Sequence, residues 1–123
     1  MIGEAYVSIF KYYNSNVRKM SFKNRPVLVV GKSDDKDYVI LPISRVTNKH
    51  YLDPEYDVEI TKEDFPLMNL KENSYIRAHK QSVVHESELV ERIVDFKSEY
   101  NSTYNEAIKK MKKFQDRIIE NAL

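Results

Sequence analysis

The sequence predicts a mainly β fold, a small barrel or sandwich, followed by one or two C-terminal helices. Short apolar stretches with a period of two, separated by turn residues, recur through the first two thirds of the chain. After His85 the apolar residues instead recur every three or four positions, which is the helical period. The 123 residues fit a single domain in size, and we divide them into a β-barrel domain over 1–85 and a helical segment over 86–123, packed on the barrel or on a partner.

The first part of the chain contains three expected strands. Residues 5–10 alternate between two faces, as a half-buried strand does, whereas residues 12–24 are polar and basic and are expected to form a long loop. Residues 26–30 are a continuous, largely β-branched run, so we expect a strand that is buried on both faces. Turn residues over 31–37 connect it to a partner strand at 38–43, which completes a hairpin.

Shorter strands are expected in the middle of the chain. Residues 45–54 resemble a loop, 57–60 a short strand, and 65–70 a compact apolar connection. Residues 74–79 alternate again, and 83–84 are expected to pair as a short final strand. Four acidic residues around the 57–60 strand alternate and are expected to form the solvated face of an edge strand: Asp53, Glu55, Asp57 and Glu59.

The C-terminal part has the pattern of amphipathic helices. Apolar residues at helical spacing predict a helix over 86–99, which Asn101 and Ser102 interrupt. Thr103 and Glu106 have the spacing of a capping box and predict the start of a second helix. A single long bent helix is the alternative.

Composition excludes several classes of function. The chain has no cysteine, three histidines and two glycines, which excludes disulfides, thiolate nucleophiles, cysteine–zinc sites, Walker A loops and Rossmann fingerprints. No metal-ligand cluster is present in the sequence, and we expect no cofactor. No apolar run approaches the roughly 20 residues that cross a bilayer, and the first ten residues do not resemble a secretory signal, so we expect a soluble, cytoplasmic protein with no membrane partner.

Charge is distributed unevenly along the chain. Residues 1–33 carry six basic residues and one acidic residue, whereas residues 34–73 carry five basic and ten acidic residues. Aromatic side chains lie between the basic ones in the first zone, a composition suited to stacking bases beside phosphates. An ordinary solvated surface on tyrosine-rich strands is the other interpretation.

One pair of residues could carry catalysis without a metal. Cleavage of RNA needs a group that takes the 2′-hydroxyl proton, a group that protonates the leaving oxygen, and donors that stabilise the phosphorane. Arg77 and His79 lie two positions apart on an expected strand, so their side chains would share a face and lie about 6–7 Å apart. The alternative is that Arg77 forms a surface ion pair and His79 is a half-buried edge residue.

Four segments, in this order, resemble the MazF/PemK/Kid toxins of type II toxin–antitoxin systems. They are Gly3-Glu4-Ala5-Tyr6-Val7, Lys23 to Val30 around Arg25-Pro26-Val27, Val39 to Ser44 around Leu41-Pro42-Ile43, and Ser74 to Gln81 around Arg77. The resemblance covers roughly residues 3–93 and implies an SH3-like small barrel of the CcdB/MazF type. It also implies a homodimer, a metal-independent endoribonuclease acting on single-stranded RNA, and a cognate antitoxin protein.

The resemblance also implies roles for individual residues. Arg25 matches an arginine at the catalytic centre, and Ser44 occupies a hydroxyl position at which threonine is more usual. Arg77 matches an arginine that acts as an acid or phosphate clamp, and His79 replaces an aspartate base. A histidine suits that role because its ordinary pKa is about 6.5. We expect the remaining candidates to hold RNA: Tyr6, Lys19, Lys23, Lys80 and Gln81.

A binding module without catalytic activity on the same barrel is the alternative function. It would inhibit or regulate a protein or RNA partner, and Arg77 and His79 would then be surface residues.

Overall fold

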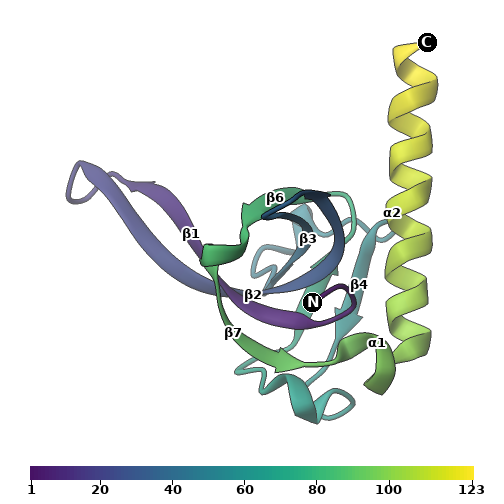
Figure 1. Cartoon of the computed structure of the whole chain (residues 1–123), viewed down its shortest axis with the longest axis horizontal. Coiled ribbons are helices and arrows are strands. Elements are labelled where there is room, and N and C mark those ends of the chain that lie inside the picture. Colours follow the sequence, from purple (N-terminus) through teal and green to yellow (C-terminus); the bar gives the residue numbers. More distant parts are fainter.

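A curled, seven-stranded antiparallel sheet forms the body of the protein, and a long helix stands beside it (Figure 1). The computed structural model describes residues 1–123. The strands are β1 (Ala5–Asn14), β2 (Lys19–Asp34), β3 (Asp37–Ser44), β4 (Asp57–Ile60), β5 (Ser74–Arg77), β6 (Ser82–His85) and β7 (Leu89–Val94). Their order is β4-β5-β3-β2-β1-β7, with β6 paired to β3. The predicted fold class, mainly β with a C-terminal helical part, is confirmed.

The centre of the sheet is buried on both faces. Val27, Leu28 and Val29 of β2 are all fully buried, as the β-branched run predicted. Leu28 belongs to the larger core cluster, which also contains helical residues, and its two neighbours belong to a second cluster on the other face. This doubly packed centre is a rigid base for the residues at its ends.

The expected loop over 12–24 is instead a β-hairpin, and that prediction was wrong. Strand β7 pairs with β1 only as far as Ser8, and β3 pairs with β2 only from Val27 onward. Residues 9–14 and 19–24 therefore pair with each other alone and project from the body as an arm (Figure 1). A ribbon solvated on both faces needs no apolar face, so its polar sequence resembles a loop, although its aromatic residues favour β structure.

The predicted helix over 86–99 was also wrong over most of its length. Residues Leu89–Val94 form β7, an edge strand that pairs with β1 through a register with two irregularities. Because of these register shifts, buried and exposed residues do not alternate strictly along β7. Its apolar residues therefore lack a period of two and have a helix-like spacing. The helical part of the chain begins at Phe96. The proposed division into two domains at residue 85 stays a prediction.

Two helices end the chain. Helix α1 (Phe96–Glu99) is a single turn, and α2 (Asn101–Ala122) follows directly after Tyr100, so Thr103 lies inside α2 and does not begin it. The first half of α2 packs on the core, and its C-terminal turns extend beyond the sheet (Figure 1). Three short 3-10 turns lie between the strands: η1 (Lys49–Tyr51), η2 (Pro66–Met68) and η3 (Glu86–Glu88). Neither helix has the length and apolar character needed to cross a membrane.

Candidate functional site

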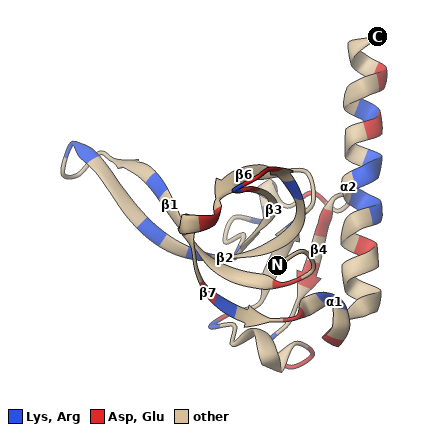
Figure 2. Ribbon diagram, viewed as in Figure 1, with Lys and Arg blue, Asp and Glu red and all other residues tan.

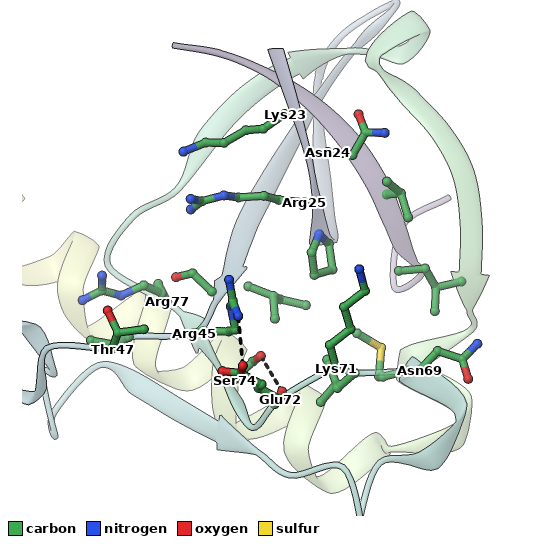
Figure 3. Close-up of a pocket in the computed structure, with 18 of the residues that line it drawn as sticks. Lys23, Asn24, Arg25, Arg45, Thr47, Asn69, Lys71, Glu72, Ser74 and Arg77 are labelled. Carbon is green, nitrogen blue, oxygen red and sulfur yellow. Dashed lines mark hydrogen bonds and ion pairs between the residues drawn. The ribbon is translucent and has the colours of Figure 1, made fainter. Parts of the chain in front are cut away.

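A pocket of about 1190 Å³ opens at one end of the sheet, beside the base of the arm. Its wall combines β1, β2, the end of β3 with the loop that follows it, the segment before β5, and β7 (Figure 3). These segments are far apart in the sequence, and sheet pairing brings them together because β2 lies between β1 and β3. The pocket is therefore a product of the sheet topology.

The lining of this pocket is strongly basic. Six lining residues are basic, and two, Glu72 and Glu91, are acidic. The basic ones are Lys23, Arg25, Arg45, Lys71, Arg77 and Arg92. The adjoining arm carries Lys and Arg but no acidic residue (Figure 2). Such an excess of positive charge around a concave site attracts an anionic ligand.

Arg25 is an exposed cation without a partner inside the chain. It lies on β2 opposite Ser8, and its side chain makes no ion pair or hydrogen bond with another residue. Lys23, two positions earlier, extends toward the same side of the pocket (Figure 3). Burial lowers the pKa of the Lys23 ammonium, and the positive charge of Arg25 lowers it further. Arg25 thus provides a fixed positive charge beside Lys23, which gives up its proton more readily than an ordinary lysine.

Arg77 lines the same pocket and is held firmly. Its Nε donates to Asp57 Oδ1 at 3.0 Å, and its Nη2 donates to the Tyr51 carbonyl at 2.7 Å and to Asp57 Oδ2 at 3.4 Å. An arginine has five N–H donors, so the two on Nη1 have no partner within the chain. Ser44 ends β3 opposite Tyr75 of β5 and also lines the pocket. Three of the four predicted catalytic residues, Arg25, Ser44 and Arg77, therefore meet at one site.

The structure places His79 outside this pocket. The imidazole lies between Tyr56 and Phe114 of α2, with ring centroids 5.7 Å and 6.0 Å away, and its side chain is only 10% exposed. Strand β5 ends at Arg77, and a turn in which the Lys80 N–H donates to the Arg77 carbonyl redirects the chain. Both side chains approach Asp57, but only Arg77 lines the pocket. Nδ1 of His79 is buried without a hydrogen-bond partner, 3.8 Å from Asp57 Oδ1.

We expect His79 to make stability depend on pH. Burial lowers the pKa of this imidazole and outweighs the negative charge of Asp57, which acts to raise it. In the unfolded chain the pKa of the imidazole is about 6.5. Below that value the unfolded state binds more protons, so this stabilisation is complete above about pH 6.5 and is lost as the pH falls through the folded-state pKa. The midpoint of thermal unfolding, measured from about pH 7.5 to 5, should fall more steeply for the wild type than for His79→Gln.

His50→Gln is the matched control, because His50 is exposed. Its unfolding midpoint should follow the wild-type pH profile. If the unfolding midpoint falls equally steeply with pH in the wild type and in His79→Gln, His79 is not the source of the pH dependence.

The residues predicted to hold RNA are dispersed. Lys23 lines the pocket, whereas Lys19 lies near the tip of the arm, and Tyr6 packs against the second core cluster, where burial raises its pKa. Lys80 and Gln81 follow β5, and the Gln81 side chain accepts a hydrogen bond from Gln115 of α2. Of these five residues, the structure brings only Lys23 to the pocket.

Several pocket residues were not predicted as site residues. Arg92 and Glu91 reach the pocket from β7, which was expected to be a helix, so the sequence carried no signal for them. Arg45 also lines the pocket and pairs with Glu72 at 3.1 Å (Figure 3). Asp57 was expected at the solvated face of an edge strand, yet its side chain is only 3% exposed. The burial of Asp57 depends on tertiary contacts that no local pattern reports.

Comparison with known proteins gives one family. A family model described as PemK-like, MazF-like toxin of type II toxin-antitoxin system matches residues 12–111. The match spans the end of β1, strands β2 to β7 and the first half of α2. No curated protein matches the chain.

Proposed function

Because the chain belongs to the PemK-like, MazF-like toxins of type II toxin–antitoxin systems, we propose that it is a metal-independent endoribonuclease that cleaves single-stranded RNA. One observation carries the proposal: Arg25, Arg77, Ser44 and Lys23 meet in a basic pocket. Guanidinium N–H groups bind phosphate oxygens strongly, so Arg25 and the free Nη1 of Arg77 suit the two sides of a scissile phosphate.

The reaction assigned to this site is an in-line transesterification. The 2′-hydroxyl oxygen of one nucleotide attacks the adjacent phosphorus, the bond to the 5′-oxygen of the next nucleotide breaks, and a 2′,3′-cyclic phosphate remains. Arg25 and the free Nη1 of Arg77 stabilise the charge that develops on the phosphorane, and the Ser44 hydroxyl donates to a phosphate oxygen. These groups supply donors where negative charge increases in the transition state.

Proton transfer requires a group inside the pocket. His79 lies under α2 and away from the pocket, so the proposal does not give it this step. Lys23 is the better candidate, because it lines the pocket beside Arg25, and burial together with that charge lowers its pKa, which favours loss of its proton. The ammonium that results can return the proton to the leaving 5′-oxygen.

The partners follow from the same proposal. We propose single-stranded RNA as the substrate, a cognate antitoxin as the inhibitor, a homodimer as the assembly, and the cytoplasm as the site of action. The arm carries lysine and arginine residues (Figure 2), and in this proposal Lys19, near its tip, contacts RNA that extends beyond the scissile phosphate.

Cleavage in EDTA tests the proposal. The purified protein is incubated with a long RNA of mixed sequence, and the cut sites and end groups are mapped. We expect discrete cuts that leave 2′,3′-cyclic phosphates and 5′-hydroxyls. A synthetic oligonucleotide with one 2′-deoxynucleotide at a mapped site should resist cleavage, because the attacking hydroxyl is absent. Arg25→Ala protein, purified in parallel, controls for contaminating ribonucleases.

Two results would contradict this proposal. Intact RNA after incubation with folded protein would favour the binding module. Cuts that appear only when a divalent metal is added, or that persist in the 2′-deoxy oligonucleotide, would assign another chemistry.

A further inference from the structure

Asp57 is a buried carboxylate that is held by an arginine and a backbone N–H. It lies on β4 directly opposite Arg77 of β5, and its side chain is 3% exposed. A carboxylate taken so far out of water is costly unless charged and hydrogen-bonding partners compensate. The groups that bind this carboxylate therefore indicate what it does.

Both carboxylate oxygens of Asp57 accept hydrogen bonds, and His79 Nδ1 lies 3.8 Å from Oδ1. Oδ1 accepts from Arg77 Nε at 3.0 Å, and Oδ2 accepts from the Asp53 backbone N–H at 2.8 Å and more weakly from Arg77 Nη2 at 3.4 Å. The backbone N–H of Asp57 donates in turn to the Asp53 carbonyl at 2.8 Å. The carboxylate is thus fixed to the turn before β4 and can hold the guanidinium in one orientation.

We infer that Asp57 is a positioning residue for Arg77, an inference that rests on the proposed ribonuclease function. The two residues lie opposite each other on adjacent strands, and the bonds from Nε and Nη2 to the two carboxylate oxygens fix the plane of the guanidinium. The Tyr51 carbonyl holds Nη2 from the other side, and only Nη1 is left for a ligand. Pre-orientation of this kind stabilises a transition state without rearrangement of the donor during the reaction.

Helix α2 supports this arrangement from behind. Lys110 Nζ donates to the Asp57 carbonyl at 3.1 Å, and Lys113 pairs with Glu55 at 2.8 Å. Phe114 packs edge-on against Tyr56, with ring centroids 5.1 Å apart. The C-terminal helix is therefore attached to the segment that carries Asp57. Its role in the proposed reaction is to keep Asp57, and through it Arg77, in place.

The test is a kinetic comparison of Asp57→Asn with the wild type on an oligonucleotide that has one cut site. Asparagine keeps the size of the side chain but removes the charge and one acceptor, so Arg77 loses its fixed orientation. We expect kcat to fall by about 10- to 100-fold while KM changes by less than about threefold. The Arg77 Nε–H signal in the NMR spectrum should shift or broaden.

Glu59→Gln is the matched control, because Glu59 lies on the same strand and accepts from the Tyr75 hydroxyl at 3.0 Å but does not contact Arg77. It should leave kcat and the Arg77 signal unchanged. A second comparison places Asp57→Asn in an Arg77→Ala background. If Asp57 acts through Arg77, the double variant should cleave no more slowly than Arg77→Ala alone.

Lys110→Met is a milder variant for use if Asp57→Asn does not fold. It removes the bond to the Asp57 carbonyl and leaves the carboxylate, and we expect a fall in kcat of about threefold together with a shifted Arg77 signal. Additive losses in the double variant, or a wild-type kcat in both Asp57→Asn and Lys110→Met, would overturn the inference alone. Absence of cleavage by the wild type would instead overturn the proposed function, and the inference with it.

Discussion

Replacement of Arg25 by alanine is expected to lower kcat/KM for RNA cleavage by about 10²–10³-fold, the typical cost of losing one donor to a developing oxyanion. The Arg25 side chain is exposed and has no ion pair or hydrogen bond within the chain, so its charge stabilises no contact of the folded protein. The free energy of unfolding should therefore change by less than about 0.5 kcal/mol. Initial rates on a single-site oligonucleotide and urea unfolding measure the two quantities.

Two further variants make the result specific. Arg25→Lys keeps the charge but loses the paired N–H donors, so its rate should lie between those of the wild type and Arg25→Ala. Lys11→Ala removes an exposed charge from the arm at a position that does not line the pocket, and its rate should stay close to the wild-type rate. Equal losses for Lys11→Ala and Arg25→Ala would mean that general electrostatic attraction, and not a contact with the scissile phosphate, explains the effect.

The strands in the body of the sheet could be predicted because each has a local sequence pattern typical of β structure. The run that contains Val27, Leu28 and Val29 is apolar on both faces, which is what a doubly covered strand requires. The arm and β7 could not be predicted in the same way. The arm has no buried face, and β7 is a bulged edge strand whose pairing with β1 joins residues more than 80 positions apart.

The site was predictable only in part, for a related reason. Arg25, Ser44 and Arg77 lie on strands, and sheet pairing brings them to one pocket, as the family resemblance implied. The argument that placed His79 in the same site as Arg77 assumed a continuous strand, but β5 ends at Arg77. His79 approaches Asp57 as Arg77 does, yet it packs under α2 and does not line the pocket. Asp57 belongs to a series of alternating acidic residues, which predicted a solvent-exposed side chain. Glu59, in the same series, is exposed as expected. Contacts with Arg77 and α2, distant in the sequence, bury Asp57 instead.

The largest effect on stability is expected from Phe96→Ala, which should lower the free energy of unfolding by about 3–5 kcal/mol. Phe96 is fully buried at the point where β7 passes into the helical segment. Its ring stacks on Phe65 with centroids 6.0 Å apart and lies 5.2 Å from the ring of Tyr100. Truncation removes these contacts and leaves a cavity in the larger core cluster, which also includes Tyr104 of α2. Urea unfolding followed by circular dichroism measures the loss.

Phe22→Ala is the matched control, because Phe22 lies on the arm and is 64% exposed. The same truncation there should change the free energy of unfolding by less than about 0.5 kcal/mol, since little apolar surface is buried. Similar losses for the two variants would show that Phe96 does not anchor the helical segment.

If Phe96→Ala instead loses helical signal before the sheet unfolds, α2 detaches first. Lys110 would then leave the Asp57 carbonyl, and cleavage should decline at urea concentrations at which the sheet is still folded.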